Sequence, residues 1–494
     1  MTTIEDRFRR EEVTLFDGRV PVLFVPANLG VYCLTAEAAR ALRLVREGCS
    51  SDMAAQTLGC TAETVRAFLG HTMEILEEDQ KNIDLPAPRT LKSGGKLPQL
   101  VFMVNNFCNL KCRYCYEHEN VFTEPPTTMP KDLAKAAIET MSDIFSEIER
   151  IMFIGGEPAL CEDILDFICE QATAIAQKKG QPSPAFCMIS NGTKFTPTLA
   201  DTVARFRIQI TFSVDGPPVV HDQLRVHHDN SPSFVTISQN IQRYRELDVA
   251  PVAIECTVTS VHREAQLSIS SLLDYFGREF GVDEAHVAVA GLSADSPLNP
   301  GQEGGAYHLE FAEAAAASVE RLINRMMGRT TQGAAMDLVT AMLRRLKSRR
   351  GSVQMCPAGT TQLVVDSAGD IYPCWMFAGD KTYRIGNIAS VDGEATLNSP
   401  VLQRIYANSK ANNEDCRVCY ARHLCNACLG NNRIATGAIE KMSPAFCNTV
   451  RAIAQQTIVG YAEASHNAEV RKYIASGRQM RDLEASGCDA VAST

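Results

Sequence analysis

Three cysteines lie close together in this chain, directly after an apolar run. The run covers residues 100–104, and the cysteines are Cys108, Cys112 and Cys115, with the spacing C-x3-C-x2-C. Iron in an iron-sulfur cluster prefers sulfur ligands and needs four of them to be closed. Three thiolates on one short loop can therefore hold three irons of a 4Fe-4S cube and leave the fourth iron open for a ligand.

The chain around this loop alternates between β-prone and helical segments. The expected strands are Leu100–Val104, Arg150–Ile154, Ala185–Ile189, Ile208–Val214, Ala253–Thr259 and His286–Ala290. Such alternation is typical of parallel strands joined by crossover helices. Because ligands of parallel folds bind at the carboxyl ends of the strands, we expect the functional residues there. The predicted fold class is α/β.

The cysteine loop, with Tyr114 as the aromatic residue before the last cysteine, resembles the signature of the radical S-adenosylmethionine (SAM) enzymes. The resemblance implies a partial (β/α)6 radical SAM barrel over residues 99–300. It also implies that the cluster held by Cys108, Cys112 and Cys115 binds the amino and carboxylate groups of the SAM methionine through its open iron.

Other segments after the expected strands fit this resemblance. The segment Gly155-Gly156-Glu157-Pro158 resembles the GGEP segment that contacts the SAM amino group, and glycines allow a close backbone approach. The segment after the fourth strand resembles one whose serine and aspartate contact the ribose and methionine of SAM and whose arginine contacts the carboxylate. The implied residues are Ser213, Asp215 and Arg225. A surface ion pair is the alternative for Arg225, and the turn at 190–193 is either structural or substrate-facing.

Seven more cysteines follow in a second constellation. It resembles the SPASM extension, which binds two auxiliary 4Fe-4S clusters in peptide-modifying radical SAM enzymes, except that two residues, not three, separate its fifth and sixth cysteines. The resemblance implies one cluster on Cys416, Cys419, Cys425 and Cys447, and another on Cys356, Cys374 and Cys428. The second set lacks one thiolate, so either another cysteine completes it or an iron stays open. Two structural zinc sites are the alternative, because C-x2-C pairs also suit zinc.

Residues 1–84 read as a separate winged-helix-like domain, with short strands followed by helices over 36–47, 52–58 and 62–79 that begin after the cap-type residues Thr35, Ser51 and Thr61. The domain looks like the leader-peptide recognition element of peptide-modifying radical SAM enzymes, which captures an extended peptide by strand addition. A DNA-binding winged helix and a wing that only packs on the barrel are the alternatives. An acidic helix end at 74–79 disfavours DNA.

The remaining boundaries follow from composition. Residues 85–98 carry the proline, glycine and charge content of a linker. Residues 301–350 are expected to form a helical bridge that ends in a basic run, read as a solvated helix end or as a contact for an acidic peptide. Residues 351–450 form the expected C-terminal cysteine-rich SPASM domain, and residues 451–494 a C-terminal helix and tail.

Charge and cysteine content limit the surroundings of the protein. The net charge of −10 disfavours nucleic-acid or anionic-membrane partners. The N-terminal stretch lacks the apolar core of a signal peptide, and no apolar run is long enough to span a membrane. We therefore expect a cytoplasmic protein. In that reducing compartment its eighteen cysteines stay thiols, and the eight outside the two constellations are expected to be buried apolar residues.

The resemblance implies an enzyme with SAM and three 4Fe-4S clusters, one radical SAM and two auxiliary. It would cleave SAM to a 5′-deoxyadenosyl radical and modify a ribosomally made precursor peptide, using a low-potential electron donor such as flavodoxin or ferredoxin. Cysteine thioether cross-linking is the expected reaction, with carbon-carbon or carbon-oxygen cross-linking and epimerisation as alternatives. Formylglycine formation is disfavoured, because Trp375 stands where sulfatase-maturing relatives have an aspartate. A non-catalytic iron-sulfur or zinc winged-helix regulator is the alternative of another class.

Overall fold

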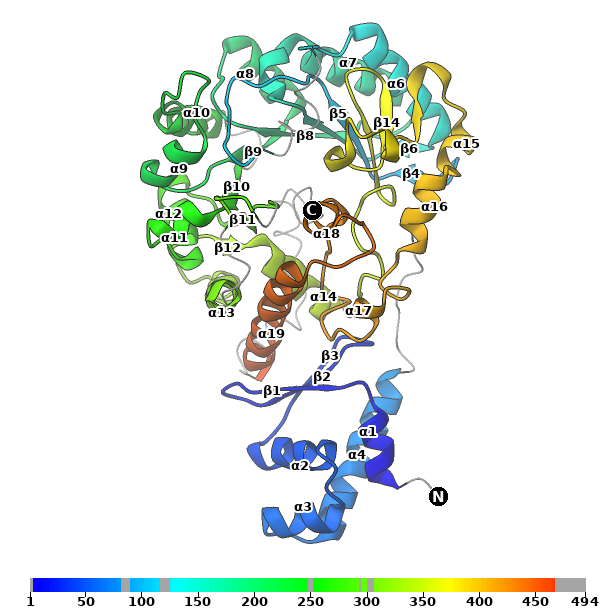
Figure 1. Cartoon of the computed structure of the whole chain (residues 1–494), viewed down its shortest axis with the longest axis vertical. Coiled ribbons are helices and arrows are strands. Elements are labelled where there is room, and N and C mark those ends of the chain that lie inside the picture. The colour runs from blue at the N-terminus through cyan, green and yellow to red at the C-terminus, as the bar shows by residue number, and fades with distance from the viewer. Residues whose placement is uncertain are drawn as a thin grey trace.

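The computed structural model describes residues 3–80, 89–115, 125–247, 252–292, 295–299 and 306–466. A small N-terminal unit lies at one end of the molecule, and a large α/β body lies at the other (Figure 1). The last described helix, α19 (Pro444–His466), lies between them.

The N-terminal unit is a three-stranded antiparallel sheet covered by helices. The strands β1 (Thr14–Phe16), β2 (Val22–Val25) and β3 (Gly30–Cys33) pair in that order. The helices are α1 (Ile4–Arg10), α2 (Ala36–Arg46), α3 (Ser51–Leu58) and α4 (Ala62–Gln80). Alternate residues of a strand face opposite sides, so Leu23 and Val25 pack with the helices, whereas Val22 and Phe24 join the core of the body.

Two local features of this unit differ from the sequence-based expectation. Helix α1 was not predicted. Thr35 caps α2 as expected, accepting a hydrogen bond from the Ala38 amide at 3.1 Å. The cap of α3, however, is Ser50 and not Ser51. Both the amide and the hydroxyl of Ser51 donate to the Glu5 carboxylate instead, which ties α3 to α1.

The body is built on a ten-stranded sheet in the order β12-β11-β10-β9-β8-β7-β5-β13-β14-β15. The six strands predicted from the sequence are adjacent and parallel: β5 (Gln99–Met103), β7 (Arg150–Ile154), β8 (Ala185–Ser190), β9 (Gln209–Ser213), β10 (Val252–Val258) and β11 (Glu284–Val289). This arrangement confirms the predicted partial barrel.

Helices cover the outer face of this curved sheet (Figure 1). They are α6 (Lys131–Ile144), α7 (Glu162–Lys178), α8 (Pro197–Phe206), α9 (Pro218–Leu224), α10 (Phe234–Glu246), α11 (Ser260–Glu264) and α12 (Ile269–Phe280), with the 3-10 helix η1 (Pro158–Cys161) after β7. The end of the predicted linker is part of the body, because β4 (Lys96–Leu97) pairs with β6 (Glu147–Ile148).

The predicted helical bridge contains a strand as well as helices. Between α13 (Ala306–Met326) and α14 (Asp337–Ser348), the short strand β12 (Ala335–Met336) pairs in parallel with β11. The reading of the basic run as a solvated helix end is wrong for Arg345, whose guanidinium donates to the Leu424 carbonyl at 2.7 Å. Arg349 forms a salt bridge with Asp79 of the N-terminal unit.

The cysteine-rich region continues the barrel sheet. Strand β13 (Gln362–Val365) pairs in parallel with β5, and β14 (Asp370–Tyr372) and β15 (Gly386–Asn387) follow as antiparallel strands. The helices after them are α15 (Gly393–Leu397), α16 (Pro400–Ala407), α17 (Glu414–Arg417) and α18 (Leu429–Thr436), with the 3-10 helices η2 (Trp375–Phe377), η3 (Lys381–Tyr383) and η4 (Ile388–Ser390).

Helix α19 starts before the predicted C-terminal helix and connects the N-terminal unit to the body. It packs along α13 and also contacts β2 and β3. The Cys33 thiol donates to the Ala462 carbonyl, and the Arg19 amide donates to Glu463. Because one face of the N-terminal sheet is covered in this way, the unit has a defined position on the body. No helix among the described residues has the length and apolarity needed to cross a membrane.

Candidate functional site

The three-cysteine loop lies at the carboxyl end of β5, and the segment after α9 holds it in place. The Lys111 amide donates to the Val226 carbonyl at 2.8 Å, and the Arg113 amide donates to the Leu224 carbonyl at 2.9 Å. The Cys112 thiol is buried, and those of Cys108 and Cys115 are half-buried. The loop therefore presents three thiols from a backbone that is fixed on one side.

The turn after β8 holds the other side of this loop. The side-chain amide of Asn191 donates to the Cys108 sulfur at 3.5 Å and to the Asn109 side chain at 3.0 Å. Asn109 in turn donates to the Thr193 hydroxyl at 2.8 Å. These contacts favour the structural reading of the turn at 190–193, because its polar side chains position the cysteine loop.

The two glycines after β7 bring their backbone directly against the same loop. The Gly156 amide donates to the Asn105 carbonyl at 3.1 Å, and the Glu157 amide donates to the Phe107 carbonyl at 3.0 Å. A Cβ atom at position 156 would lie 2.1 Å from the Phe107 carbonyl oxygen. A Cβ at Gly155, where φ is +153°, would lie 2.5 Å from the Asn105 side chain. The glycines are thus required for packing against the cysteine loop, a role that the sequence did not reveal.

Glu157 is a buried organising residue. Its side chain is 1% exposed, and its carboxylate accepts hydrogen bonds from the Ala159 amide, the Ser190 hydroxyl and the Asn191 amide at 2.6 to 2.9 Å. Burial raises the pKa of Glu157, and these hydrogen bonds oppose the shift. Through Asn191, the carboxylate fixes the position of Cys108. Its contact with SAM stays a prediction.

Tyr114, Asp215 and Arg225 form one hydrogen-bonded group. The Tyr114 hydroxyl donates to an Asp215 carboxylate oxygen at 2.6 Å and accepts from the Arg225 guanidinium at 2.5 Å. The other Asp215 oxygen accepts from the Thr257 amide at 3.1 Å. The structure therefore brings together three side chains that the sequence places in separate segments.

Arg225 is buried and is not part of a surface ion pair. Burial lowers the pKa of Arg225, but the nearby Cys112, Tyr114 and Asp215 raise it well above the usual value. Within the described residues, its Nε atom has no hydrogen-bond partner. A buried guanidinium with an unused donor fits an anionic ligand such as a carboxylate. The donor set thus suits the methionine carboxylate of SAM.

A row of polar residues crosses the inner face of the barrel from Ser213. The Ser213 hydroxyl donates to Glu255 at 2.6 Å, and Glu255 is in register with His286 on the next strand. Nδ1 of His286 lies 3.0 Å from an Asp337 carboxylate oxygen. Burial lowers the pKa of His286, but Asp337 and then Glu255 outweigh it and raise the pKa. Sequence reasoning missed the last three residues of this row, although each is a charged or titratable residue in or directly after an otherwise apolar strand.

Three of the other cysteines lie near one another, one before β13, one after β14 and one at the start of α18. Burial and the neighbouring Cys428 raise the pKa of Cys356 to about 12. Burial, Cys428 and Cys356 raise the pKa of Cys374 well above its usual value. Cys428 is the N-cap of α18, and its sulfur lies 3.6 Å from that of Met376. We call Cys356, Cys374 and Cys428 the first auxiliary group.

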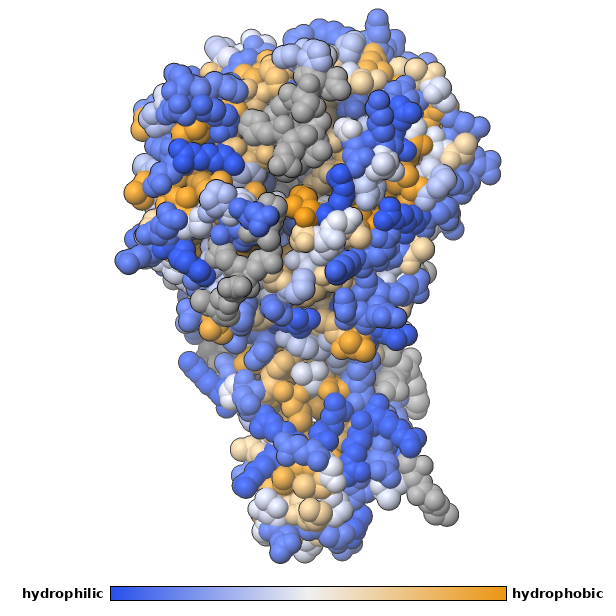
Figure 2. All heavy atoms as spheres, in the orientation of Figure 1, coloured by the Kyte–Doolittle hydropathy of each residue, from blue (hydrophilic) through white to orange (hydrophobic). Residues whose placement is uncertain are grey.

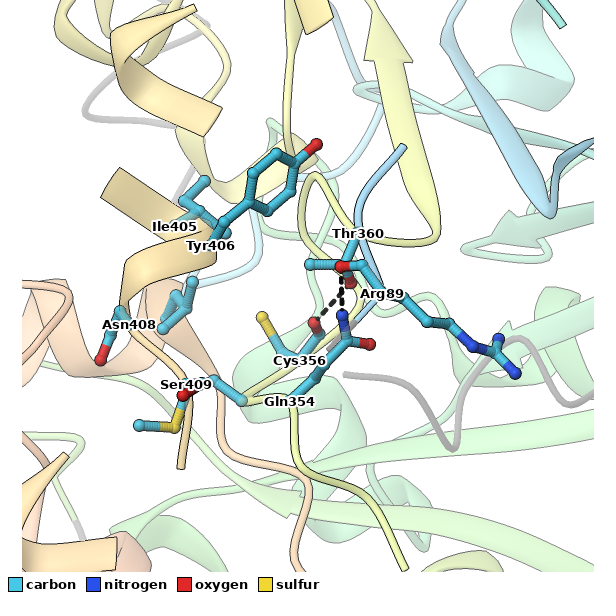
Figure 3. Close-up of a pocket in the computed structure, with 10 residues that line it drawn as sticks. Arg89, Gln354, Cys356, Thr360, Ile405, Tyr406, Asn408 and Ser409 are labelled. Atoms are coloured by element: carbon cyan, nitrogen blue, oxygen red, sulfur yellow. Dashed lines mark hydrogen bonds between the residues drawn. The ribbon is translucent and has the colours of Figure 1, made fainter. Parts of the chain in front are cut away.

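A small hollow adjoins Cys356 (Figure 3). It lies beside the start of the body at Arg89, whose carbonyl accepts a hydrogen bond from Gln354. Cys356 is the only cysteine in its wall, which consists of Arg89, Gln354, Met355, Cys356, Thr360, Ile405, Tyr406, Asn408, Ser409 and Leu429. This side of the group therefore supplies no further thiol among the described residues.

Four cysteines form the second auxiliary group, which we define as Cys416, Cys419, Cys425 and Cys447. Burial and the neighbouring Cys425 and Cys447 raise the pKa of Cys416 to about 12. Burial raises the pKa of Cys447 to about 11, with Cys425 and Cys419 contributing to the same shift. The neighbours that shift these pKa values follow the two sets that the SPASM resemblance implies, with Cys428 acting on Cys356 and Cys374, and the assignment of each set to a cluster stays a prediction.

The donors of both groups are all thiols, which suit a 4Fe-4S cluster and also suit zinc. Across the described part of the chain, no three Cys, His, Asp or Glu side chains are gathered closely enough to hold a single metal ion. The choice between zinc and iron-sulfur clusters rests on the family matches.

The scattered cysteines lie elsewhere. Cys161, Cys169, Cys187 and Cys256 are buried in the barrel, as predicted. The prediction of burial is wrong for Cys33 and Cys60, which are exposed, and for Cys49, which is half-buried, all in the N-terminal unit. Cys488 lies outside the described residues. None of the seven described scattered cysteines is on the elements that carry the first auxiliary group.

The amino-acid sequence matches two known families. Residues 102–262 match the radical SAM superfamily, and residues 356–420 match SPASM, an iron-sulfur cluster-binding domain. A cysteine-type anaerobic sulfatase-maturating enzyme of Clostridium novyi is 22% identical over 382 residues, which cover 73% of this chain and 95% of that enzyme. The radical SAM cyclopropyl synthase TigE of Paramaledivibacter caminithermalis is 18% identical over 74% of this chain and 75% of its own length.

Solved structures share the fold. The structure of anSMEcpe with bound AdoMet and the Cp18Cys peptide has a TM-score of 0.60 at 17% identity, covering 77% of this chain and 99% of that one. The structure of Streptococcus suis SuiB bound to its precursor peptide SuiA has a TM-score of 0.50 at 15% identity, covering 88% and 98% of the two chains.

Proposed function

Because this chain combines a radical SAM domain, which needs SAM and a 4Fe-4S cluster, with a SPASM domain, which binds auxiliary iron-sulfur clusters, we propose that it cross-links a ribosomally made precursor peptide. The bond formed is a thioether between a cysteine sulfur and a carbon of the same peptide. The chain is related to both peptide and sulfatase maturases.

We assign the catalytic centre to the cysteine loop and the residues around it. Cys108, Cys112 and Cys115 would hold the catalytic cluster, and its SAM would lie against Tyr114, the backbone at 155–157, Ser213, Asp215 and Arg225. When bound, cluster and SAM together supply a 5′-deoxyadenosyl radical, which takes a hydrogen atom from the peptide. The protein contributes position: Arg225 and Asp215 orient the two ends of a zwitterionic ligand, and Tyr114 fixes their separation.

The observation that carries the thioether proposal is the composition of the first auxiliary group. Among the described residues it contains three cysteines, and the hollow beside Cys356 brings no fourth. Three thiolates leave one iron of a cube available for a thiolate from the substrate. A metal-bound cysteine loses its proton readily, because the cation stabilises the thiolate.

His286 is suited to accept that proton. It is half-buried on the inner face of β11, its Nδ1 faces Asp337, and it shares its row with Ser213, the residue assigned to SAM. A histidine oriented by a carboxylate keeps its other ring nitrogen available as a base. The atoms and electrons would balance: one hydrogen atom would leave the carbon with the 5′-deoxyadenosyl group, His286 would take the thiol proton, and an auxiliary cluster held by the SPASM cysteines would supply the acceptor for the remaining electron.

The N-terminal unit would capture the leader part of the peptide. Within the described sheet β1 and β3 pair only with β2, so they are its outer strands, and an extended peptide can add to a sheet at such a strand. Apolar residues lie over this sheet on the face shown in Figure 2. SuiB, whose structure covers 88% of this chain, was solved with a precursor peptide.

The test uses anaerobically reconstituted protein, SAM, dithionite and cysteine-containing candidate peptides encoded by short reading frames near the gene. A thioether removes two hydrogen atoms from the peptide and makes one cysteine resistant to iodoacetamide, and a Cys→Ser peptide stays unmodified. Carbon-carbon or carbon-oxygen cross-linking would remove two hydrogen atoms and leave every thiol reactive. Epimerisation would leave the mass unchanged in water and add deuterium in heavy water. Absence of 5′-deoxyadenosine would contradict the whole proposal.

Sulfatase maturation is the second candidate, because enzymes of that activity match most of this chain. The residue after Cys374 is Trp375, which is buried in η2 and offers no carboxylate. We therefore expect a cysteine-type sulfatase peptide such as Cp18Cys to remain unchanged under the same conditions. Formylglycine in that peptide would favour this second candidate.

A further inference from the structure

A lysine is buried between the two auxiliary groups without a carboxylate partner. Lys410 follows α16, and its side chain is only 1% exposed. Its ammonium group donates to the Ser352 carbonyl at 3.2 Å and to the Cys425 carbonyl. The salt bridges among the described residues include none to Lys410. An unpaired charge is costly to bury. The ammonium group therefore needs a negative group nearby, and the carboxylates of the described residues do not provide one.

The thiols nearest to this charge belong to both auxiliary groups. Lys410 interacts electrostatically with Cys425 and Cys416 of the second group and with Cys356 of the first. Burial raises the pKa of the Cys425 and Cys356 thiols, and the positive charge of Lys410 lowers it. Lys410 therefore lies where the fields of two anionic clusters would overlap.

Arg345 brings a second positive charge to the same place. Its guanidinium donates to the Leu424 carbonyl at 2.7 Å and to the Asn426 side chain at 2.7 Å, and it also reaches the Cys425 carbonyl at 3.4 Å. Two cations directed at one short segment repel each other. Their convergence on the backbone of Cys425 is favourable only if that segment carries compensating negative charge.

A 4Fe-4S cluster bound by four thiolates is net negative and becomes more negative on reduction. A fixed positive charge beside it stabilises the reduced form more than the oxidised form, and the reduction potential rises. We propose that Lys410, assisted by Arg345, raises the reduction potential of the second auxiliary cluster. This inference rests on the assignment of Cys416, Cys419, Cys425 and Cys447 as its ligands. In the cross-linking proposed above, a higher potential favours transfer of the surplus peptide electron away from the reaction centre.

The test is a redox titration that needs no peptide, so it is independent of the bond that the enzyme forms. Cys108, Cys112 and Cys115 are all replaced by alanine, which removes the catalytic cluster and leaves the auxiliary signals. Reconstituted Lys410→Met, Lys410→Arg and Lys178→Met proteins in this background are titrated anaerobically with dithionite and followed by electron paramagnetic resonance. Lys178 is an exposed lysine at the end of α7, on the outer face of the barrel.

Lys410→Met should lower the potential of the second auxiliary cluster by at least a tenfold shift in the one-electron equilibrium, which is about 59 mV. The first auxiliary cluster should shift less in the same direction, and Lys410→Arg and Lys178→Met should leave both potentials unchanged. Equal potentials in Lys410→Met and Lys178→Met, or an upward shift, would overturn the proposal. If Lys410→Met fails to retain iron, Arg345→Met decides, because it should lower the same potential and an unchanged value contradicts the role of charge.

Discussion

Replacing Gly156 by alanine should remove the catalytic cluster while leaving the auxiliary clusters in place. The new Cβ would lie 2.1 Å from the carbonyl oxygen and 2.2 Å from the carbonyl carbon of Phe107, where ordinary contact begins at 3.4 Å. One of the two backbones has to retreat by more than about 1 Å, since both sets of atoms are backbone and no rotamer change relieves the overlap. Cys108 is the next residue after Phe107, so the displacement is passed directly to the first cluster ligand.

The same displacement breaks hydrogen bonds that hold the loop. The Gly156 amide to the Asn105 carbonyl and the Glu157 amide to the Phe107 carbonyl are the two bonds at risk, and each contributes about 0.5 to 1.5 kcal/mol. We expect iron to fall from roughly twelve to roughly eight atoms per chain, as four-iron clusters require. Reductive cleavage of SAM, measured as 5′-deoxyadenosine, should fall to the level of Cys108→Ala.

Gly70→Ala is the matched control. Gly70 lies inside α4, its Cβ would meet no heavy atom within 4 Å, and its backbone is helical. Alanine should therefore stabilise that helix by about 0.5 to 1 kcal/mol and leave iron content and SAM cleavage unchanged. A Gly156→Ala protein with the full complement of iron and wild-type SAM cleavage would refute the idea that these glycines position the cluster loop.

Three further predictions concern other parts of the molecule. Tyr114→Phe removes the hydroxyl that joins Asp215 and Arg225. We expect SAM binding to weaken by about 1 to 3 kcal/mol in calorimetric titration, and unchanged affinity would mean that this hydroxyl does not organise the site. His286→Gln should keep 5′-deoxyadenosine formation but slow peptide cross-linking by about a hundredfold or more, measured by mass spectrometry, and cross-linking at the wild-type rate would exclude His286 as the base. Burial raises the pKa of Glu5, but hydrogen bonds from Ser51 outweigh this effect and lower the pKa from 4.5 to about 2. The folded carboxylate therefore adds stability above pH 4.5, and this stability is lost as the pH falls toward 2. Thermal unfolding of Glu5→Gln should therefore show a stability deficit at pH 7 that shrinks at pH 3, and an equal deficit at both pH values would contradict the shift.

The sequence predicted the elements of the barrel well because its strands are apolar runs bounded by turns. It also singled out the ten cysteines of the two constellations, since spacing along one loop is a local property, and their roles as cluster ligands stay predictions. What it missed depends on pairing between distant segments. Glu255 and His286 face each other only because β10 and β11 pair in one register. Arg345 reads as a solvated helix end until the segment at 424–426 packs against it. The GGEP glycines could be recognised, but the backbone that they contact could not.

The position of β13 explains how the chain places the three-cysteine loop and the first auxiliary group far apart. This strand pairs in register with β5, from Gln362 opposite Gln99 to Val365 opposite Phe102. The catalytic loop leaves the carboxyl end of β5, whereas Cys356 precedes β13 and Cys374 follows the antiparallel β14, so both lie at the opposite end of the same strands. Five residues of strand span about 17 Å, and backbone hydrogen bonds make that separation rigid. The catalytic cysteine loop and the first auxiliary group therefore lie at opposite ends of the same strands, so a peptide on the inner face of the barrel would lie between them.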